Sequence, residues 1–298
     1  MASQVTVIRK IVAPLGLSRW LPTILRFARR KPLGTFGAIV ILGLLFMGTF
    51  ADEVAPYRFD DFNIPERLQS PSMRHPFGTD NQGRDVLSRV IYGARTTVFV
   101  GFGAVTVTML VAVTLGIVSD YFGGLLDLLV QRLVDIWQAF PGLIFVIFVV
   151  SITGPGVPTL IFTIGLLFVV GCSRVIRSAT LAIKENPYVE AARIIGYGDL
   201  RIIRRQILPN VMPIILVVAS IYIGSAILLE SSLSFLGYGT PPPFPSWGRM
   251  LQEAQREIVN YPYLAIFPGA AIALTVYSFN MFGDALRDVM DPRLRGSR

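Results

Sequence analysis

Six apolar stretches of membrane-spanning length limit what this chain can fold into. They cover residues 33–51, 96–118, 125–152, 159–173, 211–229 and 265–282. A helix rises about 1.5 Å per residue, so a stretch of about 20 residues crosses the roughly 30 Å hydrocarbon core of a bilayer. Hydrophobic residues make up 53% of the sequence and charged residues only 15%, a balance that excludes an ordinary soluble domain. We therefore predict an all-α polytopic membrane protein with six transmembrane helices.

The basic residues predict how these helices are oriented. Of the 27 lysines and arginines, 19 fall in the segments that six spans place on the same side as the termini. Positive charge concentrates on the cytoplasmic side of membrane proteins, so we expect both termini to be cytoplasmic. The net charge of +8 is then a consequence of topology in a lipid bilayer and does not indicate a nucleic-acid partner.

This orientation divides the chain into four parts. They are a cytoplasmic leader at 1–32, a first transmembrane helix with an extracytoplasmic loop at 33–95, a five-helix core at 96–282, and a cytoplasmic tail at 283–298. No small-residue cleavage site follows the first span, which indicates an uncleaved anchor. The loop at 230–264 contains a proline run and Trp247, so we expect it to fold partly back against the helices.

The longest basic insert between the apolar stretches, residues 186–209, has the pattern of short amphipathic helices. Asn186 is a suitable N-cap, and Pro187 fits the first helical position, where a missing N–H costs nothing. Residues 188–195 continue as a helix. Gly196 ends it, because glycine adopts a left-handed C-terminal conformation without steric cost.

A second helix is predicted at residues 200–208, with Asp199 as its cap and Pro209 as its stop. Its apolar residues recur at helical spacing, at Leu200, Ile203 and Ile207. Its arginines lie largely on the other faces, at Arg201, Arg204 and Arg205. Two short helices hinged at a glycine form a compact knob suited to a groove on another protein. The alternative is an amphipathic loop that lies on lipid headgroups.

Part of this insert resembles the signature of permease subunits of ABC importers, E-A-A-x3-G-x9-I-x-L-P. The matching residues are Glu190, Ala191, Ala192, Gly196, Leu208 and Pro209, while Gln206 stands where the pattern prefers isoleucine. Residues 75–95, 235–251 and 291–295 are similar to C-type permeases of the dipeptide, oligopeptide and nickel branch. The resemblance covers the chain from about residue 29 to its end.

This resemblance implies a MetI-like type I ABC importer permease fold and an assembly with other chains. The partners would be a second permease subunit, two ATP-binding subunits and an extracytoplasmic substrate-binding protein, in a bacterial or archaeal cell membrane. The six signature residues would couple this chain to the ATPase. ATP and magnesium would be bound there, because this chain has no phosphate-loop sequence, and it would need no cofactor of its own. The implied cargo is di- or oligopeptides, with nickel complexes or oligosaccharides as the alternative.

The residues give little support to an enzyme or an ion-driven carrier. Cys172 is the only cysteine and lies in an apolar run, and His75 is the only histidine and is expected to be solvated in a loop. No cluster of metal ligands or catalytic groups accompanies them, which argues against an intramembrane enzyme. The five best-defined spans have no ionisable residue in their interiors, which argues against a secondary transporter.

Neutral polar residues in the spans are the candidates for lining a transport pathway. They are Thr106, Thr108, Thr114, Ser220, Tyr222 and Ser225. Each of them could instead pack or form hydrogen bonds between helices, and the sequence leaves that choice open. Arg132 and Asp135 are three apart on one helix face and are expected to pair.

Overall fold

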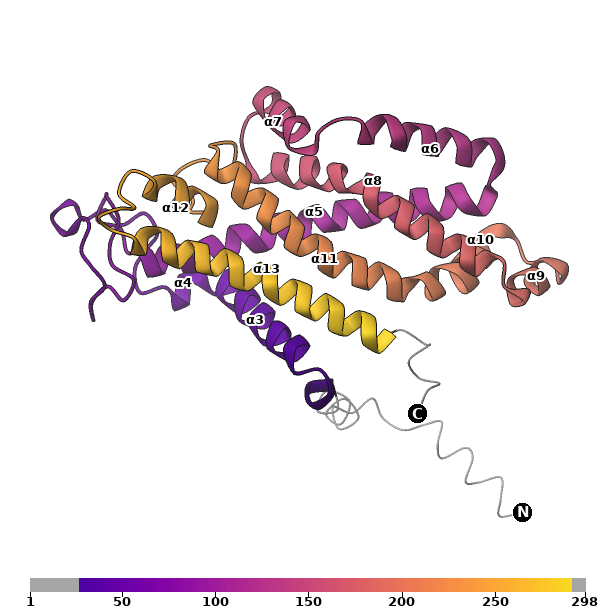
Figure 1. The fold of residues 1–298 in the computed structure, drawn as a ribbon, viewed down its shortest axis with the longest axis horizontal. Helices are drawn as coiled ribbons and strands as arrows, with labels where there is room; N and C mark the ends of the chain where they lie inside the picture. The colour runs from indigo at the N-terminus through magenta and orange to yellow at the C-terminus, as the bar shows by residue number, and fades with distance from the viewer. Residues whose placement is uncertain (1–26, 291–298) are drawn as a thin grey trace, which may run out of the picture.

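The computed structural model describes residues 27–290 and consists of helices joined by turns and two longer loops (Figure 1). The elements are α3 Pro32–Thr49, α4 Ala51–Val54, η2 Ile64–Glu66, α5 Val86–Phe122, α6 Gly124–Gln138, α7 Gly142–Thr153, α8 Val157–Lys184, α9 Pro187–Ile194, α10 Asp199–Ile202, η3 Ile203–Ile207, α11 Leu208–Phe235, α12 Trp247–Ala254 and α13 Tyr263–Met290. The predicted all-α fold is confirmed. Most of the predicted leader, and residues 291–295, lie outside the described residues.

Five of the described helices are long and apolar enough to cross a membrane, and α6 and α7, which meet at an 83° bend, count as a sixth if the pair is taken as one span. The predicted single helix at residues 125–152 is therefore broken. Pro141 lies at the break, immediately before α7. Its ring disfavours the helical conformation of the preceding residue and it has no N–H to donate, so a regular helix does not run through it.

Several spans extend beyond their predicted bounds. α5 begins at Val86, earlier than predicted, because the carboxylate of Asp85 accepts a hydrogen bond from the backbone N–H of Ser88 at 2.8 Å. α8 continues to Lys184 and α13 to Met290, so part of the predicted tail is helical. Apolar runs mark only the part of a helix that faces lipid, and polar turns extend the helix into water.

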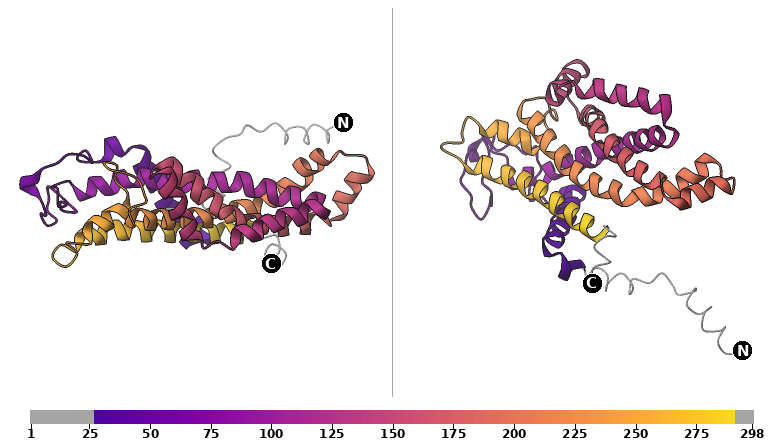
Figure 2. Two further views of the ribbon diagram at one scale, coloured as in Figure 1. Left: turned by 90° about the horizontal axis from the view of Figure 1, so that it is seen from above. Right: turned by 45° about the vertical axis from the view of Figure 1, so that its right-hand side comes forward.

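The long helices lie side by side, and the two ends of the bundle carry different elements (Figure 1, Figure 2). α5 packs along α8, α11 along α13, and α13 along α3. Backbones approach closely at small residues: a Cβ added to Gly165 of α8 would lie 2.9 Å from the carbonyl oxygen of Ala104 on α5. α9 and α10 project at one end, and α12 lies with the loop at residues 55–85 at the other.

Buried contacts fix α12 and the chain before it to the bundle. α12 packs against α11 and α13, which confirms that the loop after α11 folds back. The indole of Trp247 is 2% exposed and donates to the carbonyl oxygen of Val90 at 2.9 Å. The hydroxyl of Thr96 donates to the carbonyl oxygen of Pro245 at 3.0 Å. Both bonds join this loop to the first turns of α5.

Four charged side chains tie the loop at 55–85 to α12. Arg84 and Arg89 each donate to Asp80 at 2.6 Å, and they donate to Glu253 at 2.8 and 2.7 Å. Asp80, Arg84 and Arg89 are all buried. Two carboxylates and two guanidinium groups thus compensate one another, which is the condition under which charges are tolerated in a protein interior.

The prediction that His75 is solvated is wrong. Its imidazole is buried, with Nδ1 2.9 Å from an oxygen of Asp85 and Nε2 3.4 Å from an oxygen of Glu66. Both carboxylates come from nearby in the same loop, so the folding of the loop encloses the ring. Asp85 also caps α5, and His75 therefore supports the start of that helix.

Glu230 was placed by the sequence in the loop after the fifth span, but it lies within α11 and is fully buried. Ser234 donates to its carboxyl group at 2.6 Å, and the hydroxyl of Ser231 lies 3.4 Å away. Among the described residues, hydroxyl groups and not cations satisfy this carboxyl group. The spans are therefore free of interior ionisable residues only within their predicted, shorter bounds.

Candidate functional site

We call the insert at residues 186–209 the knob. Its first half is a short helix that ends at a glycine. α9 runs from Pro187 to Ile194. Gly196 has φ +87°, and its N–H donates to the carbonyl oxygen of Arg193, while the N–H of Tyr197 donates to that of Ala192. These two bonds form the Schellman motif, which satisfies carbonyl groups at a helix end. The predicted helix end at Gly196 is confirmed.

Asn186 occupies the N-cap position, but its side chain does not cap the helix. The amide of Asn186 instead donates to the carbonyl oxygens of Ala182 and Ile183, both at 3.0 Å, at the end of α8. The residue therefore closes the preceding helix and turns the chain into α9.

The second half of the knob differs from the prediction at both ends. Gly198 is the N-cap, and Asp199 is the first helical residue. Pro209 does not stop the helix, because α10, the wider π-helical turn η3 and α11 follow one another without a break. Pro209 lies in the first turn of α11, directly after η3. A π-type turn changes the hydrogen-bond pattern where the proline lacks an N–H, so the helix can pass through it.

A small apolar cluster attaches the knob to the bundle, and we call the buried knob residues in it the seat. Val189, Ile202 and Ile207 are fully buried, and Ala192 is 5% exposed. They pack with residues of α5, α8 and α11, in a cluster separate from the main core. Leu200, which the sequence placed on the apolar face, is 69% exposed, and Ile202 is buried in its place.

Polar contacts align the knob with the ends of α5 and α8. The hydroxyl of Tyr121 donates to the carboxylate of Asp199 at 2.7 Å, and the guanidinium of Arg193 lies 5.1 Å from the Tyr121 ring centroid. The ammonium group of Lys184 donates to the backbone carbonyl oxygen of Asp120 at 2.6 Å. Both halves of the knob are thus held at the end of α5.

Charge pairs hold α6 to α8 near the same end. Arg177 donates twice to Asp127, at 2.8 and 2.6 Å, in the planar two-bond geometry that suits arginine and carboxylate. The predicted pairing of Arg132 with Asp135 is present at 3.5 Å, but Arg174 contacts Asp135 more closely, at 2.6 Å. The pairing within α6 is therefore secondary to a pairing between helices.

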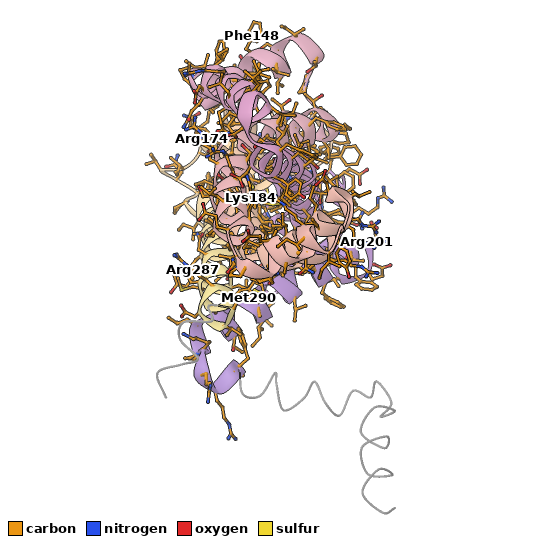
Figure 3. All side chains as sticks on the ribbon, turned by 90° about the vertical axis from the view of Figure 1, so that its right-hand side faces the viewer. Phe148, Arg174, Lys184, Arg201, Arg287 and Met290 are labelled. Carbon is orange, nitrogen blue, oxygen red and sulfur yellow. The ribbon has the colours of Figure 1, made fainter. Side chains whose placement is uncertain are left out.

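The outer surface of the knob is apolar at its tip and basic beside it. Ile194 and Ile195 are 80% and 74% exposed, and Tyr188 is also exposed. Arg201, Arg204 and Arg205 are exposed as well. Figure 3 looks at this end of the bundle, where Lys184, Arg201 and Arg287 are seen on α8, α10 and α13. This end of the bundle therefore presents a protruding apolar tip with basic side chains beside it.

The six signature residues divide between the seat and the surface of the knob. Glu190, Ala191, Gly196 and Pro209 are exposed, Leu208 is half-buried and Ala192 is buried. The sequence did not single out Val189 and Ile202, which anchor the two halves. The spacing of Val189 and Ala192, three apart on α9, is the signal that could have identified the buried face.

The pathway candidates lie on two helices that contact each other, α5 and α11. Thr108 is buried in α5 and donates to the carbonyl oxygens of Ala104 and of Gly165 on α8, at 2.9 and 2.8 Å. The ring of Tyr222 packs on that of Phe168, with centroids 5.0 Å apart. These two candidates join α8 to its neighbours.

The other four candidates share one local arrangement. Their hydroxyl groups each donate to the carbonyl oxygen four residues earlier in the same helix: Thr106, Thr114, Ser220 and Ser225. Ser220 is buried, whereas the other three are exposed on the monomer. A hydroxyl bonded in this way needs no partner from another helix.

Comparison with known proteins places the chain in a family. The family model described as binding-protein-dependent transport system inner membrane component matches residues 112–296. The dipeptide transport system permease protein DppC of Alkalihalophilus pseudofirmus is 38% identical over 267 residues, covering 90% of this chain and 88% of that protein. The glutathione transport system permease protein GsiD of Pectobacterium atrosepticum is 39% identical over 271 residues, covering 91% and 90%.

Solved structures confirm the fold. An inward-facing conformation of the MetNI methionine ABC transporter aligns with a TM-score of 0.58 at 18% identity, over 68% of this chain and 97% of that chain. An amino acid ABC transporter with histidines aligns with a TM-score of 0.53 at 17% identity, over 68% and 94%. The chain therefore belongs to the inner membrane components of binding-protein-dependent transport systems, as a type I ABC importer permease of the peptide branch.

Proposed function

We propose that this chain is the transmembrane subunit through which short peptides enter the cell, driven by ATP hydrolysis in partner subunits. The names of the two relatives above support this cargo, because dipeptides and glutathione are both short peptides. The chain would work with a second permease subunit, two ATP-binding subunits and an extracytoplasmic substrate-binding protein. ATP and magnesium would be bound by the ATP-binding subunits, and this chain would hold no cofactor.

The exposed apolar tip of the knob is the observation that carries this proposal. Ile194, Ile195 and Leu200 expose most of their side-chain surface to water at the end of the bundle. Burial of apolar side chains releases about 25 cal/mol per Å², so a partner with a matching groove would stabilise the knob considerably. An ATP-binding subunit in that position would receive the signature residues Glu190 and Ala191.

Two neighbouring glycines allow a matched test of this coupling. Gly196 has φ +87°, a conformation that β-branched side chains resist, whereas Gly198 has φ −67° and ψ 151°, which any residue adopts. A Cβ at either position would meet no atom within 4 Å. We expect Gly196→Val to abolish ATP-driven uptake with normal membrane insertion, and Gly198→Val to retain it. Normal uptake by Gly196→Val would refute the coupling role.

The orientation of the chain is part of the proposal, with both termini in the cytoplasm. Gln69 is exposed in the loop at the α12 end, and Ser297 lies outside the described residues. An impermeant thiol reagent added outside intact cells should label Gln69→Cys and leave Ser297→Cys unlabelled. The reverse labelling pattern would overturn this orientation.

The cargo is tested with the assembled transporter in proteoliposomes. Radiolabelled tri-alanine should accumulate only with ATP and the binding protein present. Uptake of a nickel complex or an oligosaccharide, with no uptake of peptides, would replace the proposed cargo and leave the permease function standing.

A further inference from the structure

A groove runs between the α12-side halves of α11 and α13. Its volume is about 680 Å³, within the range of roughly 300–1,000 Å³ that is typical of small-molecule sites. Leu251 of α12 and Asn280 of α13 are among its lining residues. Figure 1 shows α12 across the ends of α11 and α13.

The lining of this groove is neutral throughout. Its walls are mainly apolar, with residues such as Phe235, Ile272 and Val276. The polar lining residues are Ser231, Ser232, Tyr277 and Asn280. Tyr277 and Asn280 are three apart and share a face of α13. A ligand in the groove would meet hydrogen-bonding groups along apolar walls and no charged lining residue.

Two of these polar groups lack partners. Ser232 donates to the carbonyl oxygen of Leu228 at 2.8 Å, but within residues 27–290 neither the amide of Asn280 nor the hydroxyl of Tyr277 forms a side-chain hydrogen bond. Asn280 lies about 26 Å along α13 from Tyr263, within a helix that is long and apolar enough to cross a membrane. Tyr277 is 48% exposed and Asn280 is half-buried, so both can reach a ligand in the groove. An amide that faces acyl chains without a partner would cost about 4–8 kcal/mol on alkane transfer scales, which favours a polar occupant over lipid.

We propose that the groove is a binding station for the transported peptide, which rests on the proposed function and assigns residues to it. An extended short peptide carries backbone N–H and C=O groups that the amide of Asn280 and the hydroxyl of Tyr277 can bond. The apolar walls accept its side chains. A helix of the second permease subunit fits less well, because its backbone groups are already satisfied within the helix.

Accessibility distinguishes the possible occupants. Ala273 lines the groove, whereas its neighbour Leu274 is exposed on another face of α13. In the assembled transporter, a water-soluble methanethiosulfonate should label Ala273→Cys at least about 10-fold faster than Leu274→Cys. Tri-alanine should slow labelling of Ala273→Cys several-fold. Equally slow labelling of both variants would show that a helix or lipid covers the groove, and labelling unaffected by tri-alanine would show only water in it.

Transport kinetics test the role of the amide. Asn280→Leu keeps the size of the side chain and removes its hydrogen-bonding groups, so KM for tri-alanine should rise about 10-fold with kcat changed less than about twofold. Asn280→Gln should restore part of the affinity, and Leu274→Ala should leave KM unchanged. An unchanged KM in Asn280→Leu would refute the binding station. Failure of the wild-type transporter to accumulate any peptide would refute the proposed function itself.

Discussion

The two ends of this bundle differ in whether their charged and large side chains are buried with partners or exposed. At the α12 end, Asp80, Arg84, Arg89 and Glu253 compensate one another's charges, and Trp247 is buried. At the knob end, isoleucine, leucine, tyrosine and arginine side chains are exposed. The α12 end is thus held together by buried charge pairs within this chain, while the knob end presents apolar and basic side chains outward.

This difference separates stability from function. Side chains at the α12 end have many partners within the chain, so their loss should unfold structure. Side chains on the knob tip have few partners, so their loss should weaken an assembly and leave the fold intact. The following predictions test that separation, from the largest expected effect on stability to the smallest.

Removal of Arg89 should have the largest effect. Arg89→Leu would leave Asp80 with Arg84 alone, and Glu253 with Arg84 and the longer contact to Arg249 at 3.3 Å; breaking a buried pair in this way costs about 3–5 kcal/mol. The apparent melting temperature of the detergent-solubilised protein should fall accordingly. Arg204→Leu, at an exposed position of the knob, is the matched control and should melt like the wild type. Equal melting of Arg89→Leu and the control would contradict the comparison.

Acid should loosen the α12 end before the knob. Burial raises the pKa of the Glu253 carboxyl group, but the charges of Arg89, Arg84 and Arg249 outweigh it, and the pKa lies below its ordinary value of 4.5. A carboxyl group whose pKa is lowered in the folded state stabilises the fold at pH values above its ordinary pKa. This stability is lost as the pH falls through the lowered pKa.

Hydrogen exchange as a function of pH measures this loss directly. Protection of α12 should fall as pH drops below the ordinary carboxyl value of 4.5 in the wild type, whereas Glu253→Gln should lack this acid-dependent step. Protection of α9 should not follow the same titration. A common acid transition for both helices would show that the two ends are not independent.

A cavity in the seat of the knob should have a moderate effect. Ile202→Val removes one methylene group from a fully buried side chain, which typically costs about 0.5–1.5 kcal/mol. Leu200→Val, at the exposed neighbouring site, should cost less than about 0.5 kcal/mol. Thermal unfolding of the two variants compares the seat with the surface of the same short helix.

The smallest effect on stability should come from the tip itself. Ile194→Ser alters a side chain that is 80% exposed, so melting should change by no more than about 0.5 kcal/mol. Co-purification of the ATP-binding subunit with this variant should nevertheless fall strongly. Wild-type recovery of that subunit would mean that Ile194 is not part of the contact.

The sequence predicted what depends on local chemistry and missed what depends on distant partners. Apolar runs identified the spans, and the glycine at 196 identified a helix end, because neighbouring residues determine both. The hydrogen bond from Tyr121 to Asp199 joins residues 78 apart, so nothing near Asp199 shows that its carboxylate is already engaged. His75 and Glu230 were misplaced because loop folding and the extension of α11 bury them. Pro209 was misjudged because η3 adjusts the backbone before it.

The unbroken path through Pro209 makes one backbone reach from the knob to the α12 end. Residues 199–235 form a single helix of 37 residues, about 55 Å long at 1.5 Å per residue. Such a rod acts as a lever, and tilting it by about 5° moves one end by roughly 5 Å relative to the other. Its far end carries Ser231 and Ser232 of the groove and the carboxyl group of Glu230. Asp199 is therefore connected to the α12 end through α10, η3 and α11, with no loop between them.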